Sequence, residues 1–203
     1  MGREASFQAI PENCELLIRA RQEREIAEDM QFSLMEATEE PNPRYERSPE
    51  EQYFYDAVQE LIRVHPGLEK RYFYAGARTY DAIIYLLSPA RREEEFDGDQ
   101  SLIKKATWGV ELLHPEARAT QGVPIGFVSR VDTKIIADYL EQITMEQLHE
   151  HYNPSKMSEA AVYKMGPNRD ERRFQVIWEE FVGMRDVYRA AANHDEAVIT
   201  VID

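Results

Sequence analysis

The sequence predicts an α/β fold, also describable as α+β, in which helices pack on both faces of a small mixed sheet to give three layers. Two observations at the ends of the chain indicate the sheet: residues 5–10 alternate weakly, and AVITVI at 197–202 has the composition of a buried strand near the middle of a sheet. A third indicates the helices, because residues 169–192 carry apolar side chains at helical spacing. Helices are expected to outnumber strands.

The first part of the chain is expected to hold a strand followed by helix. The strand at 5–10 stops at Pro11, and a helical pattern then runs over residues 12–37. Its middle, RARQEREIAED, is so charged that either one face lies in water or the helix breaks there. Residues 38–49, TEEPNPRYERSP, contain three prolines and no periodicity, which predicts a loop.

The next helices are predicted from their start and stop signals. Ser48 and Glu51 have the spacing of a capping box, and HPG at 65–67 ends the helix that they begin. Residues 75–87 predict a largely buried helix, stopped by Ser88-Pro89 and followed by an acidic loop at 91–100.

In the second half of the chain, one segment has an ambiguous secondary-structure pattern and the others have clear ones. Residues 102–113 fit helix or strand, residues 122–131 predict a strand, and residues 133–143 predict a helix. Thr144 with Gln147 forms a second capping box, and Asn168 with Glu171 forms a third that would open the longest helix, ended by Asn193 as a left-handed cap. We expect one domain over 1–203, because the loop at 38–49 is short and the part before it is too small to fold alone.

Composition and charge exclude several classes of function. Acidic residues exceed basic ones by 38 − 24 = 14, so nucleic acids and anionic membranes are unfavourable partners. No apolar run approaches the roughly 20 residues of a membrane span. The lone Cys14 agrees with a reducing, cytoplasmic setting and is expected to be a partly buried filler. The acidic cluster at 93–99 lacks the spacing of a calcium loop.

The histidine pair in QLHEHYNPSKM (147–157) is the most suggestive metal pattern. A helix begun by Thr144 turns His149 and His151 about 200° apart around its axis, so they cannot chelate one ion. We expect neither a metal nor a cofactor. Phosphate loops, zinc cysteines and nucleophile elbows are also absent from the sequence.

Five residues are the candidates for ligand binding. Arg78, Tyr80 and Asp81 are polar positions in the apolar stretch GARTYDAIIY, although Arg78 and Asp81 also have the spacing of a simple ion pair. Trp108 lies in the ambiguous segment, and Arg130 follows the predicted strand GVPIGFVS, where α/β sheets collect ligands. Each also has an ordinary structural role, with aromatic rings packing in the core.

Several motifs resemble the YfbM-like family of bacterial proteins, a domain family of unknown function. The motifs are TYDAIIYLLS (79–88), GFVS before a helix, YNPSKM before AVY, the long helix with NHDEAVITVID, and the start MGREASFQAI. The likeness is best from about Tyr72 onward and weak at about 20–70. It implies a single three-layer α/β domain and no assigned activity. Ile84 stands where family members have a histidine, and Tyr80 where they have a tryptophan, whereas Asp81 matches.

Three functional hypotheses follow. The first is a small acidic binding or regulatory protein that shields a basic partner, in the manner of an immunity protein. The second is an enzyme on a polar small molecule, with a cleft in which Tyr80, Asp81 and Arg130 converge. The third is a structural protein whose role lies in its own assembly.

Overall fold

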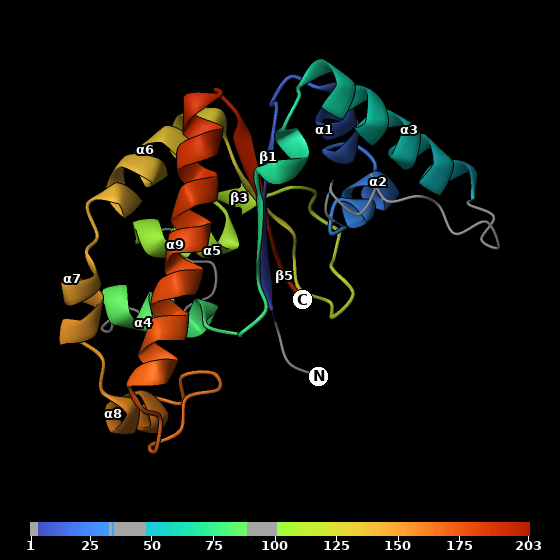
Figure 1. Cartoon of the computed structure of the whole chain (residues 1–203). Coiled ribbons are helices and arrows are strands. Elements are labelled where there is room, and N and C mark those ends of the chain that lie inside the picture. The colour runs from blue at the N-terminus through green and yellow to red at the C-terminus, as the bar shows by residue number, and fades with distance from the viewer. Residues whose placement is uncertain (1–3, 33, 35–47, 89–100) are drawn as a thin grey trace.

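The sheet is built around the two terminal strands of the chain (Figure 1). The computed structural model describes residues 4–32, 34, 48–88 and 101–203. Strand β1 (Ala5–Ile10) pairs antiparallel with β5 (Ala197–Ile202) over its whole length. The five strands lie in the order β2-β1-β5-β4-β3, with β2 at Tyr72–Ala75, β3 at Glu111–Leu112 and β4 at Gly126–Val128. The short strands therefore lie outside the two long ones.

The predicted fold class is confirmed, but the sheet is not mixed. Every pairing among the described strands is antiparallel. The apolar run of β5 is buried at all of its positions, a pattern that parallel strands share. Here the burial comes from the central place of β5 in the sheet and from helices on both sides, so the run carries no information about strand direction.

Helices cover both faces, as predicted (Figure 1). On one side lie α4 to α9, and on the other side lie α1 to α3. The first group comprises α4 (Tyr80–Leu87), α5 (Leu102–Trp108), α6 (Arg130–Glu141), α7 (Met145–Glu150), α8 (Pro154–Glu159) and α9 (Glu171–Asn193). The second comprises α1 (Glu15–Ala20), α2 (Arg24–Asp29) and α3 (Pro49–Val64), after which a short 3-10 turn, Leu68–Lys70, leads into β2. None of the described helices is both long and apolar enough to span a membrane.

The two faces of the sheet carry different side chains. Phe7 points toward α9, where its ring meets that of Tyr188 with centroids 6.4 Å apart. Gly183 of α9 lets Phe73 approach, because a Cβ there would lie 2.3 Å from the ring. The neighbouring residue Ser6 points to the opposite face, since side chains alternate along a strand. The α9 face thus holds the densest apolar packing.

Two of the three predicted capping boxes are confirmed. Ser48 with Glu51 and Thr144 with Gln147 each form both reciprocal bonds. The third is wrong, because Asp170 occupies the cap position of α9 and its side chain makes no cap bond. The left-handed residue after α9 is Asp195, with φ 57°, so Asn193 is still helical.

Several predicted boundaries are corrected. The helix expected at 12–37 breaks between α1 and α2 in its charged middle. The predicted loop at 91–100 lies wholly outside the described residues, and the one at 38–49 lies outside them except for Ser48 and Pro49, which cap and begin α3. The helix expected from Ala75 begins at Tyr80, because Ala75 ends β2 and residues 76–79 form a turn in which Arg78 has a left-handed φ of 61°. Residues 102–113 form both a helix and a strand, divided at Gly109, whose φ of 90° ends the helix.

Charge is buried at one end of the central strand pair. Arg71 donates two hydrogen bonds to Glu196, Nε to Oε2 at 2.8 Å and Nη2 to Oε1 at 2.7 Å. Their side chains are only 10% and 3% exposed. The Arg71 carbonyl accepts from Ala9 N at 3.0 Å and from Gln8 Nε2 at 3.2 Å. The pair therefore ties the start of β2 to β1 and to the start of β5.

Replacing Glu196 by Leu leaves the Arg71 guanidinium buried without its counter-charge. We expect a loss of about 3–5 kcal/mol in the free energy of unfolding, measured by urea denaturation. The double variant Arg71→Met with Glu196→Leu should lose less than the single one, because no buried charge is then unpaired. The exposed Glu60→Gln variant is the control and should unfold like the parent. A Glu196→Leu variant as stable as Glu60→Gln would contradict the account.

Candidate functional site

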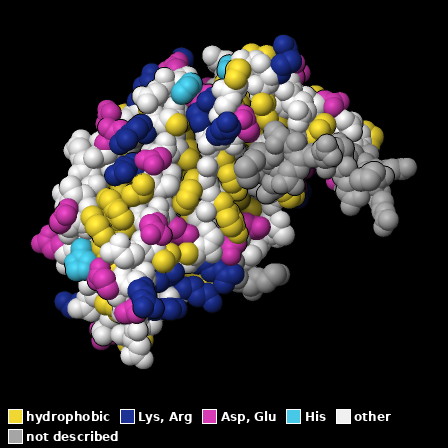
Figure 2. Space-filling view, viewed as in Figure 1, with side chains coloured by type: hydrophobic (Ala, Val, Ile, Leu, Met, Phe, Trp, Pro, Cys, Tyr) yellow, Lys and Arg dark blue, Asp and Glu magenta, His cyan; other side chains and the backbone are white. Residues whose placement is uncertain are grey.

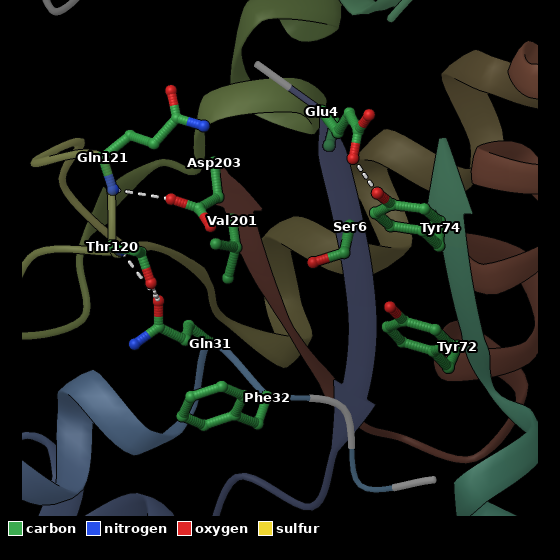
Figure 3. A pocket seen from close by; sticks show the side chains of 11 residues that line it. Glu4, Ser6, Gln31, Phe32, Tyr72, Tyr74, Thr120, Gln121, Val201 and Asp203 are labelled. Atoms are coloured by element: carbon green, nitrogen blue, oxygen red, sulfur yellow. Dashed lines mark hydrogen bonds between the residues drawn. The ribbon is translucent and has the colours of Figure 1, made fainter. Parts of the chain in front are cut away.

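A pocket of about 290 Å³ opens on the sheet face turned away from α9 (Figure 3). Its floor is formed by the start of β1, by β2 and by the end of β5. The opposite wall is formed by residues 31–32, just after α2, and by the loop at 120–121. The lining residues are Glu4, Ala5, Ser6, Gln31, Phe32, Tyr72, Tyr74, Thr120, Gln121, Val201 and Asp203.

Two carboxylates face this pocket from paired positions. The register that pairs Ala5 with Ile202 continues to Glu4 and Asp203, which bond through both backbone groups, Asp203 N to Glu4 O at 2.8 Å. Directly opposed residues share one face of the sheet, here the face of Ser6 and Val201. Like charges in such a pair repel each other, which destabilises the pairing. A cation placed near both carboxylates would relieve that repulsion.

Each carboxylate also has neighbours that orient it. Glu4 accepts a hydrogen bond from the Tyr74 hydroxyl and forms an ion pair with Arg78 at 3.1 Å. Asp203 Oδ1 accepts from the backbone N–H of Gln121 at 2.7 Å. Figure 3 shows the two acids on different sides of the opening, with Glu4 turned toward Tyr74 and Asp203 toward Gln121. The carboxylates are thus held in place on separate elements.

Aromatic rings and an amide complete the pocket. Tyr72 and Tyr74 are two apart on β2, so both rings lie on the same face. Phe32 and Tyr74 are about half exposed, at 51% and 50%. Gln31 Oε1 accepts from both the N–H and the hydroxyl of Thr120, at 2.8 and 2.7 Å. Tyrosine faces attract cations, so the walls and the carboxylates favour the same kind of ligand.

The donor set is unsuited to a tightly held metal. The described residues hold no cluster of three or more His, Cys, Asp and Glu side chains arranged to bind an ion. The pocket supplies two acids, hydroxyls and an amide around aromatic rings. An organic cation with a flat or apolar body matches this combination better than a bare ion.

Of the sequence-predicted residues, Tyr80, Asp81 and Trp108 come together in the packed layer on the α9 side. The Tyr80 ring meets Trp108 edge-on at 6.1 Å and Tyr163 at 6.1 Å. Asp81 Oδ2 accepts from the backbone N–H of Tyr163 at 2.7 Å. Tyr80 and Trp108 are 7% and 9% exposed, so their rings belong to the core.

Arg78 lies at the rim of the pocket, through its contact with Glu4. It occupies the turn before α4 with a left-handed φ of 61°. Buried Glu180 of α9 holds this turn by accepting from Ala77 N at 2.6 Å and from the Thr79 hydroxyl. Arg173 Nη2 donates to the Ala77 carbonyl at 3.0 Å. The turn therefore has a fixed place between α9 and the pocket.

Arg130 lies elsewhere. It begins α6 and binds Asp195 at 2.8 Å, just beyond the end of α9. The turn that carries Arg78 contacts α9 at Glu180, thirteen residues before the last helical residue, Asn193. The two contacts are therefore about 20 Å apart along the helix. Among the described residues, the contacts of Arg130 are therefore separate from those of Tyr80 and Asp81. Sequence spacing gave no information about which end of α9 each residue meets.

The histidines and the cysteine take ordinary positions. His149 packs edge-on against Phe174 at 4.6 Å, and its Nε2 lies 3.1 Å from Glu171 Oε2. His151 is the residue that caps the end of α7. Burial raises the pKa of the Cys14 thiol, which lowers its nucleophilicity at neutral pH.

The pocket residues escaped the sequence prediction for a definable reason. Glu4, Tyr74 and Asp203 come from three distant segments, and no strand was predicted at 72–75. The usable signal was the predicted strand at 5–10, whose outward positions include Ser6. Without strand order, no rule connects that position with Tyr74 or Val201.

Comparison with known proteins agrees with this fold. A family described as "Domain of unknown function (DUF1877)" matches residues 29–201. The crystal structure of YfbM, a protein of unknown function from Escherichia coli, superposes with a TM-score of 0.60 at 14% sequence identity, covering 98% of this chain and 99% of that one. No protein with a curated description matches. At this identity the similarity to YfbM concerns the fold alone.

Replacing Glu180 by Gln tests what holds Arg78 at the pocket. An amide cannot accept from both Ala77 N and Thr79 Oγ1 as the carboxylate does, so we expect a loss of about 2 kcal/mol in the free energy of unfolding. Urea denaturation measures it. The exposed neighbour Glu179→Gln removes the same charge and should leave stability nearly unchanged. Equal effects of the two changes would show that the turn does not depend on Glu180.

Proposed function

Because the chain belongs to the DUF1877 family, a domain family of unknown function, we propose its function from the pocket: it is a non-catalytic binding protein that receives a basic side chain of a protein partner. The observation that carries the proposal is the pair of opposed carboxylates, Glu4 and Asp203, beside two tyrosine rings. The alternative, an enzyme that uses Tyr80, Asp81 and Arg130 in one cleft, has less support, because Arg130 binds Asp195 whereas Asp81 accepts from the Tyr163 N–H.

An arginine side chain fits the chemistry of the pocket best. Its guanidinium is planar, stays charged at all relevant pH values and presents a fork of N–H donors to carboxylates. Glu4 and Asp203 supply acceptor oxygens, while the faces of Tyr72 and Tyr74 suit a flat cation. The charge-assisted bonds would also offset the repulsion between the two acids.

The size of the pocket favours a side chain over a larger ligand. Pockets for cofactors and drug-sized molecules usually span about 300–1,000 Å³. A volume of about 290 Å³ lies just below this range. A single long side chain, presented by a partner whose remaining surface stays outside, suits a small opening of this kind.

The charge of the whole chain supports a basic partner. An excess of 14 acidic residues attracts a positively charged protein over a distance and raises the rate of encounter. We propose the bacterial cytoplasm as the setting, as the lone cysteine suggests. Shielding the basic active surface of such a partner, as an immunity protein does, is the biological role that this chemistry suits.

The peptide acetyl-Gly-Gly-Arg-Gly-Gly-amide tests the proposal. In a titration followed by amide NMR shifts, we expect saturable changes at Ser6, Tyr74 and Thr120, weakened by salt because the interaction is ionic. In the Glu4→Gln, Asp203→Asn double variant, binding should weaken at least about tenfold, since each lost charged bond is worth about 1.5–3 kcal/mol.

The matched control removes two acids elsewhere. The variant Asp56→Asn with Glu60→Gln on α3 makes the same change in net charge and should bind the peptide as the parent does. A citrulline peptide, which keeps the shape without the charge, should bind weakly. Equal weakening in both double variants would show that net charge alone attracts the peptide, and absence of shifts around the pocket would refute the proposed function.

A further inference from the structure

Basic side chains gather at the start of α9, on a molecule that is acidic overall. Figure 2 shows them over the lower end of the face drawn, where α8 leads into α9 in Figure 1. We call Lys164, Arg169, Arg172 and Arg173 the basic surface. The first three are exposed and Arg173 is half-buried.

Within the part of the chain that the structure describes, the three arginines of this surface differ from most other arginines in having no acidic partner. None of the four forms an ion pair with a described carboxylate; Arg169 instead donates to the Lys164 carbonyl at 3.4 Å. Elsewhere, each described arginine except Arg118 pairs with an acid, including Arg19, Arg21, Arg24, Arg63, Arg71, Arg78, Arg130, Arg185 and Arg189. The basic surface thus gathers, within residues 164–173, four cations that no described carboxylate pairs with.

Arg173 anchors the basic surface and is the least satisfied member. Its Nη2 donates to the carbonyls of Ala77 at 3.0 Å and Arg78 at 3.5 Å. Its Nε is buried and has no partner among the described residues. Burial, followed by repulsion from Arg169, lowers the pKa of Arg173. An anion beside Arg169 and Arg173 would reduce this repulsion.

The basic surface adjoins the pocket through Arg78. The Arg78 carbonyl accepts from Arg173, while its guanidinium forms an ion pair with Glu4 at the pocket. Arg78 thus contacts the basic surface through its carbonyl and the acidic pocket through its side chain. A partner that contacts both must present charges of opposite sign at a matching spacing.

We propose that the basic surface binds an acidic segment of the protein partner, next to the basic side chain that enters the pocket. The inference rests on the proposed function in naming that partner a protein with a basic side chain. It adds a second contact that fixes the orientation of the partner, since complementary charges set the register of an interface. The partner surface would then carry carboxylates beside its arginine or lysine.

A nucleic acid is a poorer occupant of this surface. Its charge repeats along its whole length, so a bound strand must continue past the basic surface. The exposed acids Asp170, at the N-cap of α9, and Glu171 and Glu179, in the helix itself, would repel such a strand. A short acidic segment of a protein, in contrast, can end where the basic surface ends, so its carboxylates need not approach these acids.

The probe for this proposal is acetyl-hexaglutamate-amide, followed by amide NMR shifts of the full chain. We expect saturable changes at residues 164–173 and 77–79, reduced by added salt. The variant Arg169→Glu with Arg172→Glu should weaken binding at least tenfold. Both residues are exposed, so the fold should be kept. Arg63→Glu with Lys70→Glu changes the net charge equally on another surface and should bind the peptide far better than that variant.

Other outcomes would overturn the inference. Absence of shifts at the basic surface, or equal weakening in both double variants, would show that no acidic segment binds there. Tighter binding of hexathymidylate would identify a nucleic acid instead, and saturation by inorganic phosphate at lower concentration would identify a free phosphate. The arginine peptide should still bind the pocket in Arg169→Glu, Arg172→Glu protein, so failure at one contact is distinguishable from failure at the other.

Discussion

The antiparallel pairing of β1 with β5 is the constraint on which the rest of the structure depends. It joins the two terminal strands in the middle of the sheet, from Ala5 opposite Ile202 to Ile10 opposite Ala197. The ends of this pair have opposite electrostatic character. One end is closed by the buried ion pair of Arg71 with Glu196, and the other sets Glu4 against Asp203, two like charges. The first end stabilises the fold, whereas the second gives the pocket its charge.

The two faces of the sheet divide packing and binding between them. The α9 side holds the aromatic core, in which Phe7 and Phe73 pack closely against the helix. On the other side, Arg21 of the α1–α2 turn lies over the Phe127 ring at 4.7 Å, so helices cover that part of the face. The pocket occupies the opposite end of the same face, at Ser6, Tyr74 and Val201. Glu180 and Arg173 of α9 then hold the turn whose Arg78 reaches the pocket rim.

Local features were predictable from the sequence, and contacts between distant segments were not. The two terminal strands and the caps at Ser48 and Thr144 depend on near neighbours, and the sequence pattern predicts them correctly. Strand β2 was missed because it has only four residues, and its last one, Ala75, was counted as the start of the apolar helix that begins at Tyr80. Of the five predicted site residues, only Arg78 reaches the pocket, through an ion pair with a residue 74 positions away. Such a pairing depends on strand order, which no local pattern encodes.

The proposed binding role requires that Glu4 and Asp203 together bind a cationic side chain. A crystal structure of the chain with the acetyl-Gly-Gly-Arg-Gly-Gly-amide peptide tests it most directly. We expect a guanidinium in the pocket, within hydrogen-bond distance of both carboxylates and against the ring of Tyr72 or Tyr74. A peptide bound at another surface, or a pocket without guanidinium density at saturating peptide, would contradict it.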